Sequence, residues 1–489
     1  RQPEAAGEQT TPGRTSARSR LGKRSWLMIA LASLALVLAV SGVRWVTQKR
    51  ALIPIAVLPL DNLSEDPAND YFADGLTYEL IRNLSIIEGL TVRSQTSSFS
   101  LKGQPRNIRE AGKQLNAEYI LEGSVLRSGQ QLRINVLLVR VRDDLPLWSG
   151  KFDRELTDVF AIQEEISRNI VNGLRLKLAR GRRMYETSLE AYDLYLRARA
   201  LLRGLVGSKE AIGHFEEAIA KDPTFAPAYA GLATAHALRS GVFSGGGRVD
   251  IPDEIAKMRT AAETAIQLDP LLAEAHEALG MAHARDGRWK ESEKSFRRAI
   301  ELDPSDPISY SHFALSFFLP LGRFEEALHQ LRIAEEIDLL SPRVHFELGR
   351  LLISAGRYEE GASYCRKAPA DFSGKSWCLG EALLGQGRNE EAIQIFIRSR
   401  SYQANLAYAY ARSGRREEAE KLAIDLSSPH QQALVFAGLG DKERTLEALG
   451  RMTVVGPVRM GHILSNPEYA LLRGDPRLKA LRKKAGLPE

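Results

Sequence analysis

Cysteine is scarce in this sequence: the 489-residue chain contains two, Cys365 and Cys378. Two cysteines exclude a disulfide-rich scaffold and a four-cysteine zinc site. An excess of one charge sign is also lacking in most of the chain. Residues 1–50 carry nine basic and two acidic side chains. That surplus of seven exceeds the overall net charge of +6 and leaves residues 51–489 at −1. A nearly neutral body excludes a broad basic surface, so we expect no nucleic acid to bind this chain.

Motifs for catalysis and cofactor binding are absent as well. The chain has no nucleophile elbow, kinase motif set, dinucleotide-binding fingerprint or calcium loop. Gly374-Lys375-Ser376 ends like a phosphate-binding loop, but Pro369 stands where that loop requires glycine. His276 and Glu277 are followed by His283 rather than by a histidine at 280, so no zincin helix exists. We therefore predict no catalytic, cofactor-binding or metal-ligating residue, no small-molecule substrate and no enzymatic activity.

One long hydrophobic run is present. Residues 26–43 contain no charged side chain, and extension to Val46 gives a helix of roughly 30 Å, the thickness of the bilayer core. Trp26 and Trp45 lie at its two ends, where indole rings prefer the membrane interface. We predict a transmembrane helix over 26–46. A cleavable signal peptide with Ala39-Val40-Ser41 as cleavage site is the alternative.

The flanking basic residues predict the orientation of this span. Five precede it between 14 and 24, and three follow it between 44 and 50. By the positive-inside rule, residues 1–25 form a basic, disordered cytoplasmic tail, and the domains after the span lie outside the cytoplasm. This arrangement fits a single-pass protein of the bacterial inner membrane with periplasmic C-terminal domains. Residues 1–24 also resemble a linker from which an upstream partner domain has been lost.

The soluble part exceeds the size of a single hydrophobic core, so at least two folded units are expected. Residues 51–180 alternate strand-like and helix-like patterns. Apolar or alternating strand patterns cover 54–60, 89–92, 118–126, 132–141 and 147–152. Helical patterns cover 70–84, with an apolar stripe at Phe72, Leu76, Leu80 and Leu84, and also 107–115 and 156–178. This order predicts an α/β domain with a mixed sheet covered by helices.

Four stretches of this domain, at 55–80, 93–103, 119–139 and 147–166, resemble the TolB amino-terminal type of domain. Examples are IAVLPLDNLSEDPANDYFADGLTYEL and YILEGSVLRSGQQLRINVLLV. The resemblance implies a middle domain of bacterial signalling proteins, placed after a membrane helix and before tetratricopeptide (TPR) repeats. Upstream output domains in such proteins are nucleotide cyclases, Ser/Thr kinases or CadC-like winged-helix regulators. The resemblance implies no enzymatic activity for the domain and does not say what it binds.

A repeated phrase of the form Gly-Arg-x-x-Glu starts at Gly287, Gly322, Gly356, Gly387 and Gly414, at spacings of 35, 34, 31 and 27. A second phrase, Ala-Ile-x-x-Asp-Pro, ends at 223, 270 and 304. A helix–turn–helix period of 34 residues is typical of TPR proteins. We predict an all-α TPR superhelical solenoid of about seven helix pairs over 188–450 and a helical cap over 451–489.

Such a solenoid has a concave groove that binds extended peptides or single helices, so a protein or peptide partner is expected there. Aromatic residues at repeat positions are expected to fill the core rather than to contact a ligand; they are Tyr195, Tyr229, Tyr310, Phe313, Phe317 and Tyr410. The recurring Glu-Glu pairs, at 325–326, 359–360, 390–391 and 417–418, are expected to favour the helix dipoles. Cys365 and Cys378 are interpreted as buried thiols, with a disulfide as the alternative.

The sequence thus favours a membrane-anchored, non-enzymatic TPR protein that acts as a protein-binding scaffold or sensory module. One alternative is the sensory C-terminal part of an adenylate or guanylate cyclase or of a Ser/Thr kinase. The other alternative is the sensory C-terminal part of a CadC-like winged-helix transcriptional regulator. In both alternatives the output domain precedes Arg1.

Overall fold

The computed structural model describes residues 52–488, except 65, 88, 105–106, 175–184, 186, 203–208, 241–251, 371, 373 and 453–454. Residues 53–489 form one compact unit. The predicted membrane span at 26–46 and the tail before it lie outside the described residues. In the part of the chain that the structure describes, no helix has both the length and the apolar character needed to cross a bilayer.

The N-terminal part of the compact unit contains a mixed sheet, as predicted. Its strands are β1 (Ile53–Val57), β2 (Asp61–Asn62), β3 (Leu90–Val92), β4 (Tyr119–Ser128), β5 (Gln131–Arg140) and β6 (Leu145–Glu155). They lie in the order β3-β1-β4-β5-β6, and the short β2 pairs with β4. β1 runs parallel to both neighbours, with Ile55 opposite Val92 on one side and Tyr119 on the other. β4, β5 and β6 pair antiparallel through tight turns.

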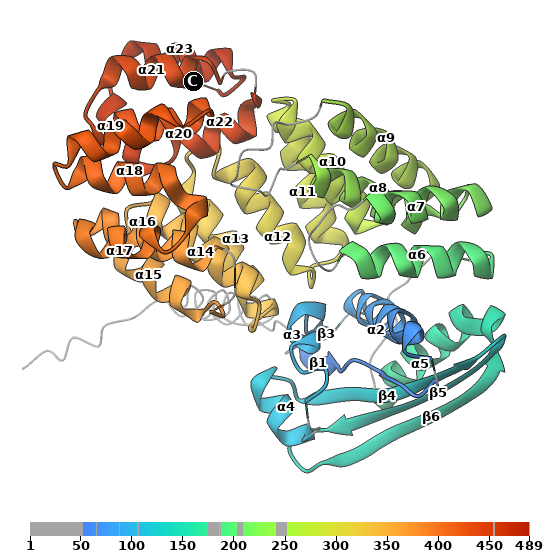
Figure 1. Ribbon diagram of the computed structural model, residues 1–489. Helices are drawn as coiled ribbons and strands as arrows, with labels where there is room; N and C mark the ends of the chain where they lie inside the picture. Colours follow the sequence, from blue (N-terminus) through green and yellow to red (C-terminus); the bar gives the residue numbers. More distant parts are fainter. Residues whose placement is uncertain are drawn as a thin grey trace, which may run out of the picture. The chain divides into compact units, whose positions relative to one another are not determined.

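Helices cover both faces of this sheet near β1. The helices of this part are η1 (Pro67–Asn69), α2 (Asp70–Ser85), α3 (Gln95–Phe99), α4 (Ile108–Gln114), η2 (Leu156–Asp158) and α5 (Val159–Gly173). Figure 1 shows α2 and α5 on the same side of the sheet. Successive side chains of β1 alternate between two cores: Ile55 packs with α2 and α5, and Ala56 packs with α4. The predicted apolar stripe of α2, from Phe72 to Leu84, is buried in the first of these cores.

The C-terminal part is an all-helical TPR-like solenoid, again as predicted. Eight consecutive helix pairs lie between 189 and 450 in the described residues, one more than the predicted number of about seven. They are α6 (Leu189–Leu202) with α7 (Lys209–Lys221), α8 (Ala226–Arg239) with α9 (Pro252–Leu268), α10 (Ala273–Arg285) with α11 (Trp289–Leu302), α12 (Pro307–Phe313) with α13 (Phe324–Ile337), α14 (Pro342–Ser354) with α15 (Tyr358–Lys367), α16 (Lys375–Gly385) with α17 (Asn389–Ile397), α18 (Gln403–Arg412) with α19 (Arg416–Ile424), and α20 (Pro429–Gly438) with α21 (Lys442–Gly450).

Shorter elements complete this part. A π-helical turn, η3 (Ala314–Phe318), continues α12, and a 3-10 turn, η4 (Arg400–Tyr402), precedes α18. The chain ends in α22 (Pro457–Leu464), η6 (Pro467–Leu472) and α23 (Pro476–Lys484).

The repeated Gly-Arg phrase forms the turn between the two helices of a pair. The glycines at 287, 322, 356, 387 and 414 all have φ between +70° and +79°, a region that favours glycine. The arginine that follows pairs with a glutamate three residues later in four copies, for example Arg357 with Glu360 at 2.6 Å. The Glu-Glu pairs therefore lie in the first turn of the second helices, where carboxylates stabilise the helix dipole.

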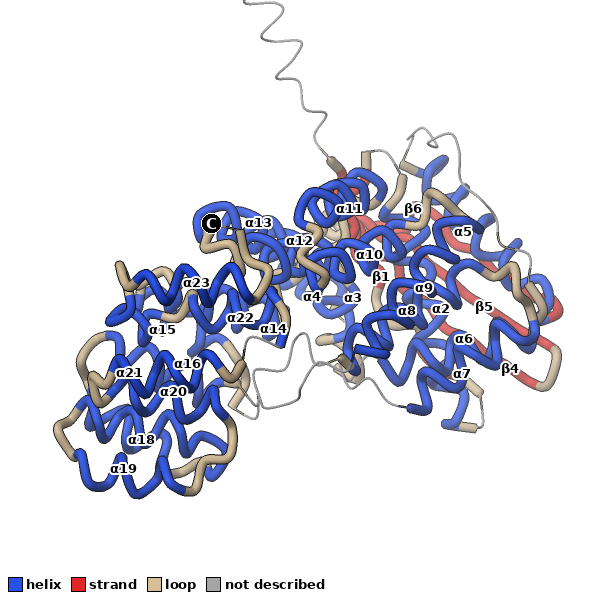
Figure 2. The backbone as a smooth tube through the Cα atoms, turned by 90° about the horizontal axis from the view of Figure 1, so that it is seen from above, coloured by secondary structure: helices blue, strands red, loops and turns tan. Residues whose placement is uncertain are grey.

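One continuous hydrophobic core joins the sheet domain to the first repeats. Tyr192, Tyr195 and Leu196 of α6 are at most 1% exposed and belong to the same core as the helix stripe of α2. In the view of Figure 2, α2 and α6 lie over β4 and β5. The predicted core role of Tyr195, Tyr310, Phe313 and Phe317 is confirmed, since all four are at most 8% exposed; Tyr229 and Tyr410 are partly buried against their cores.

Cys365 in α15 and Cys378 in α16 form a disulfide, with their Cα atoms 5.8 Å apart. Both side chains are completely buried. The interpretation of Cys365 and Cys378 as buried thiols is therefore wrong. Both are buried, but they form the disulfide that was the alternative, because α15 and α16 pack directly against each other.

Candidate functional site

A pocket lies at the carboxyl end of β1. The chain leaves β1 through α2 on one face of the sheet to reach β3, and it returns through α3 and α4 to β4 on the other side of β1; α4 covers the opposite face. The strand order therefore reverses at β1, and in open α/β sheets such a switch point leaves a crevice in which ligands bind. The cavity here has a volume of about 490 Å³. That volume falls in the range of small-molecule sites.

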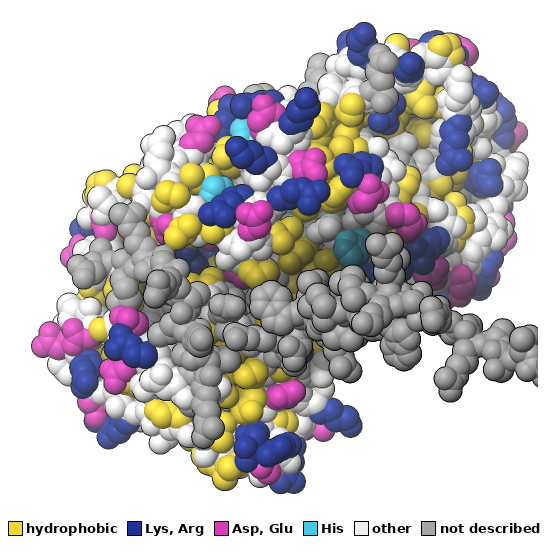
Figure 3. Space-filling view, turned by 180° about the vertical axis from the view of Figure 1, so that it is seen from behind, with side chains coloured by type: hydrophobic (Ala, Val, Ile, Leu, Met, Phe, Trp, Pro, Cys, Tyr) yellow, Lys and Arg dark blue, Asp and Glu magenta, His cyan; other side chains and the backbone are white. Residues whose placement is uncertain are grey.

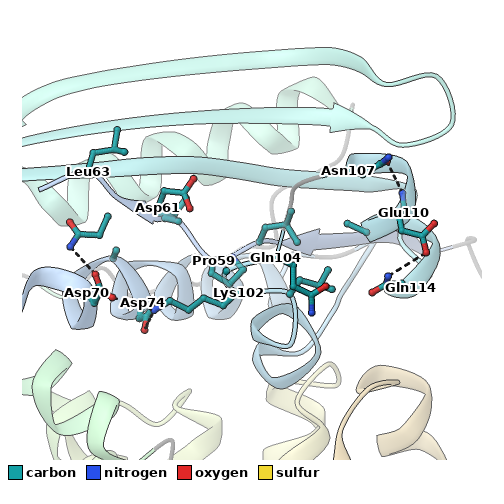
Figure 4. A pocket seen from close by; sticks show the side chains of 17 residues that line it. Pro59, Asp61, Leu63, Asp70, Asp74, Lys102, Gln104, Asn107, Glu110 and Gln114 are labelled. Atoms are coloured by element: carbon teal, nitrogen blue, oxygen red, sulfur yellow. Dashed lines mark hydrogen bonds and ion pairs between the residues drawn. The ribbon is translucent and has the colours of Figure 1, made fainter. Parts of the chain in front are cut away.

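Four segments line the pocket: the end of β1 with β2, the first turns of α2, the segment after α3, and α4. The described lining residues are Leu58, Pro59, Leu60, Asp61, Asn62, Leu63, Asp70, Ala73, Asp74, Leu101, Lys102, Gly103, Gln104, Asn107, Glu110, Ala111 and Gln114. Among them are four carboxylates and one ammonium group. Figure 4 shows the polar side chains coming from both helices that flank the strand end.

Lys102 is held between the carboxylates of α2. Its Nζ donates to both carboxylate oxygens of Asp74, at 2.7 and 2.8 Å, and lies 3.9 Å from Asp70. The Asn62 amide donates to Asp70 at 2.8 Å, and on the other wall Asn107 caps α4 by accepting from the backbone N–H of Glu110 (Figure 4). These contacts fix the polar lining before any ligand binds, a feature of sites that bind without large rearrangement.

The polar groups of this pocket are mainly carboxylates and amides. The described lining contains no Ser, Thr, Cys, His or Tyr, and its amine, Lys102, is paired with carboxylates. The polar groups that this part of the lining offers to a ligand are therefore carboxylates, amides and one ammonium group paired with carboxylates.

The same helix that lines the pocket also contacts the solenoid. From the second half of α2, the Tyr78 phenol contacts the guanidinium of Arg199 in α6, and Arg199 in turn binds Glu274 of α10 at 2.5 Å. Ser85, the last residue of α2, donates to Asp303 at 2.9 Å. The first repeats are therefore covered by the chain's own α/β domain on this side.

A second contact joins the domain to the middle of the solenoid. Ser97 in α3 donates to Asp338, which follows α13, at 2.6 Å, and accepts from the backbone N–H of Leu340. Arg93 donates to the backbone carbonyl of Glu336 at 3.1 Å. A partner in the predicted groove therefore has to bind beyond these contacts or displace them.

The first helices of three consecutive repeats, α10, α12 and α14, carry a chain of buried polar groups. Arg343 of α14 donates to Nε2 of His312 in α12 at 3.1 Å, and Nδ1 of His312 contacts Glu277 of α10. Because an arginine can only donate, Nε2 is the acceptor, so neutral His312 carries its proton on Nδ1 and donates it to Glu277. Burial and Arg343 lower the pKa of His312 to about 3, and burial and Glu274 raise the pKa of Glu277 to about 8.

His276, His283 and Lys375 lie within or beside the helices of the solenoid. His276 contacts the backbone carbonyl of Pro270 at 2.9 Å, and His283 is 7% exposed within α10. Lys375 begins α16, and its Nζ binds the backbone carbonyl of Ala368 at 2.5 Å. Within the residues described, no group of three or more His, Cys, Asp or Glu side chains is arranged to hold a metal ion.

Comparison with protein families follows the two halves of the structure. The family model for the second domain of HilA/YgeH-like transcriptional regulators matches residues 51–169. Two tetratricopeptide-repeat models match residues 273–306 and 318–375. The chain contains a HilA/YgeH-like second domain and TPR repeats. The stretches that resemble TolB domains lie in the first matched region, and that resemblance stays a prediction.

Two relatives match parts of the chain. A Rhizobium meliloti (strain 1021) protein named "Putative adenylate cyclase 3" is 38% identical over 246 residues, which are 49% of this chain and 41% of that protein. A small glutamine-rich TPR-containing protein of Mycosarcoma maydis is 31% identical over 74 residues, 15% of this chain and 21% of its own length. The chain thus spans about two fifths of the first relative and one fifth of the second.

Solved TPR structures are similar at lower sequence identity. A thermophilic TPR protein of Thermus thermophilus is 18% identical, with a TM-score of 0.34 over 40% of this chain and 99% of that one. YrrB, a TPR protein with an unusual peptide-binding site, is 18% identical, with a TM-score of 0.25 over 48% and 96%. At these scores the likeness carries no argument about this chain.

Proposed function

We propose that this chain is a non-enzymatic sensory and protein-binding module, in which a ligand in the switch-point pocket and a partner on the solenoid act on each other through α2. The observation that carries the proposal is the double role of this helix. Its first turns provide Asp70 and Asp74 to the pocket, and its second half provides Tyr78 and Ser85 to the solenoid contacts. A shift of one helix within a packed core is a common way to transmit binding between sites.

The comparisons support an output domain as the receiver of this signal. The relative of Rhizobium meliloti is named as a cyclase, and the family model belongs to transcriptional regulators. We therefore propose that the module controls a nucleotide cyclase, and, as the second candidate favoured by the family model, a DNA-binding regulator. A stand-alone scaffold without an output domain is the remaining form of the proposal.

A reporter fusion tests the sensory role. The full chain is joined behind the catalytic domain of a nucleotide cyclase in a cyclase-deficient strain, and cyclic AMP is measured. We expect the fusion to produce a different amount of cyclic AMP from the catalytic domain alone. Leu196→Ala, which loosens α2 from α6, should change the amount produced by the fusion. Leu201→Ala on the same helix is the matched control. Equal output from all three fusions and from the catalytic domain alone would contradict the proposal.

Enzymatic activity is tested separately. Incubation of the purified full chain with ATP or GTP and divalent cations is expected to give no product above background. Turnover that scales with the amount of chain would overturn the non-enzymatic assignment.

We also propose that the chain is anchored in the bacterial inner membrane by residues 26–46, with both folded halves in the periplasm. The Cys365–Cys378 disulfide supports this location, because such bonds persist in oxidising compartments. The face drawn in Figure 3 is consistent with a body without a nucleic-acid surface, since basic and acidic side chains are interspersed over it.

Topology is tested with alkaline phosphatase fused to the C-terminus. We expect activity, because that enzyme folds only outside the cytoplasm. A stably expressed but inactive fusion would reverse the orientation, and a fusion found in the soluble fraction would remove the anchor.

A further inference from the structure

The C-terminal helix α22 folds back onto the first helices of three middle repeats. It contacts α10, and in Figure 2 it lies beside α14, where Arg350 contacts Nδ1 of its His462 at 2.9 Å. Nε2 of His462 contacts the backbone carbonyl of Leu315 in η3, the turn that continues α12. Ser465, directly after α22, donates to the carbonyl of Leu319 at 3.0 Å. One face of α22 thus covers the side of the solenoid that the first helices form.

The π-helical turn η3 contains a carbonyl group that needs a donor from outside its own helix. The backbone N–H four residues after Leu315 is that of Leu319, and it is bonded to the carbonyl of Ala314 at 2.9 Å. The residue five positions after Leu315 is Pro320, which has no N–H. The Leu315 carbonyl therefore has neither its α-helical nor its π-helical donor, and a buried carbonyl without a donor costs free energy. His462 provides that donor.

The face of α22 fits this turn in shape and in hydrogen bonding. Because an arginine can only donate, Nδ1 of His462 accepts from Arg350, and Nε2 carries the proton that His462 donates to η3. Burial and Arg350 lower the pKa of His462 to about 3, so the ring stays neutral. Gly461 allows the close approach, since an added Cβ would lie 2.5 Å from the backbone oxygen of Pro320. The pattern Gly-His-x-x-Ser at 461–465 therefore combines a small residue with two donors.

This contact lies between two separate hydrophobic cores. Met460 and Ile463 of α22 are buried with α20 and α21. Leu315 and Leu319 are buried with α13 and α14. Among the described residues, Trp289 is the one that packs against both cores. Interfaces within a chain that share little hydrophobic core open more easily than the cores themselves. The polar contact of α22 with η3 is therefore the part of the C-terminal cap that can be exchanged.

We propose that η3, together with α10 and α14, is a helix-docking site of the solenoid, and that α22 occupies it until a partner helix with the same pattern takes its place. The partner is a helix with a small residue against Pro320, followed by hydrogen-bond donors one and four positions later. Insertion of a helix into a groove is a common mode of protein recognition. This inference rests on the partner binding proposed above, and it adds where the partner binds and what keeps the site closed.

A fluorescent peptide of residues 456–466 tests the site by anisotropy with the full chain in detergent. Because α22 competes with the peptide, the Gly461→Ala chain, whose α22 no longer fits against Pro320, should bind the peptide at least tenfold more tightly than the wild type. Gly213→Ala is the matched control and should bind as the wild type does. Equal binding by wild type and Gly461→Ala, or no binding to either, would overturn the proposal. If Gly461→Ala does not fold, His462→Ala/Ser465→Ala takes its place with the same expected outcomes.

Variant peptides separate docking from unspecific association. His462→Ala/Ser465→Ala in the peptide should weaken its binding to the Gly461→Ala chain at least tenfold. Met460→Ala/Ile463→Ala should leave the binding unchanged, because these two side chains belong to the C-terminal core. The reverse ranking would overturn the proposal, and dimers of the wild-type chain that the peptide dissociates would replace the separate partner by α22 of a second copy. Since this assay measures no cyclic AMP, failure of the docking site and failure of the sensory role give different results.

Discussion

Tyr195 of α6 donates a hydrogen bond to Glu79 of α2 at 2.9 Å, between two side chains that are at most 8% exposed. Burial and the Glu79 carboxylate raise the pKa of Tyr195, so the phenol keeps its proton and remains a donor. A buried charge-assisted bond of this kind is costly to break, because it leaves one polar group without a partner. The first repeat of the solenoid and the sheet domain are therefore expected to unfold together.

Replacement of Leu196 by alanine tests this shared core. Leu196 is completely buried against α2, and its loss removes buried methyl groups at a cost of about 2–5 kcal/mol. Hydrogen exchange should become faster in both α2 and α6. Leu201→Ala, on the same helix but 36% exposed, is the control and should change neither. Faster exchange confined to α6 would contradict a common core.

The contribution of Glu277 to the free energy of unfolding should fall as the pH rises from about 4.5 to 8. Glu277 has its pKa raised to about 8, first by burial and then by Glu274, so the folded chain holds a proton that the unfolded chain has lost in this window. The stabilisation is complete below pH 4.5 and lost as the pH passes 8. Burial and Glu277 raise the pKa of Asp306 to about 7, so Asp306 acts in the same direction. The other charged or titratable groups that face Glu277 are Arg199, Arg343 and neutral His312.

Denaturant unfolding at pH 5 and pH 8 measures this effect. Glu277→Gln removes the titrating group but keeps the hydrogen-bond shape, so from pH 5 to pH 8 the variant should lose less stability, or gain more, than the wild type. Asp306 still titrates in the variant. Glu263→Gln, an exposed change on α9, should leave the wild-type difference intact. An unchanged pH difference in Glu277→Gln would contradict the raised pKa.

The elements that sequence periodicity specifies were predicted, because burial of one face imposes that periodicity. The stripe of Phe72, Leu76, Leu80 and Leu84 predicted α2, and the repeated glycines predicted the turns of the solenoid. The opposite side of α2 was not predictable in this way. Tyr78 and Ser85 are polar and suggest a solvent-facing side, yet they contact repeats more than a hundred residues further along the chain.

The pocket and the contact between Arg350 and His462 also depend on topology rather than on local pattern. The apolar strand pattern ends directly before Asp61, so the end of a strand could be predicted there. Periodicity does not say that β3 and β4 lie on opposite sides of β1. Likewise Arg350 and His462 meet only because α22 returns to the middle repeats. Contacts of this kind follow from the closure of the fold, which no window of sequence contains.

Reduction of the disulfide should destabilise the solenoid. Cys365 and Cys378 are thirteen residues apart, and closing a loop of this length contributes about 3 kcal/mol in the chain-entropy account. Dithiothreitol should lower the Tm of the wild type to that of the Cys365→Ser/Cys378→Ser double variant. The reductant should leave the double variant itself unchanged, and thiol titration of the untreated, unfolded wild type should give no free thiol. Two free thiols in protein purified from the periplasm would contradict the bond.

Substitution at Gly461 should release α22 from the repeats. A Cβ atom at this position would lie 2.5 Å from the backbone oxygen and 2.6 Å from the Cα of Pro320, distances that backbone atoms cannot accommodate without moving. Gly461→Ala should therefore accelerate hydrogen exchange in 457–487 and lower the Tm, although alanine is the better helix former. Gly213→Ala in α7 is the matched control, because no atom lies within 4 Å of its added Cβ, and it should raise stability by about 1 kcal/mol. If both glycine variants stabilised the protein, the tight contact between α22 and Pro320 would be wrong, since the helix-forming preference of alanine would then be the only effect at either position.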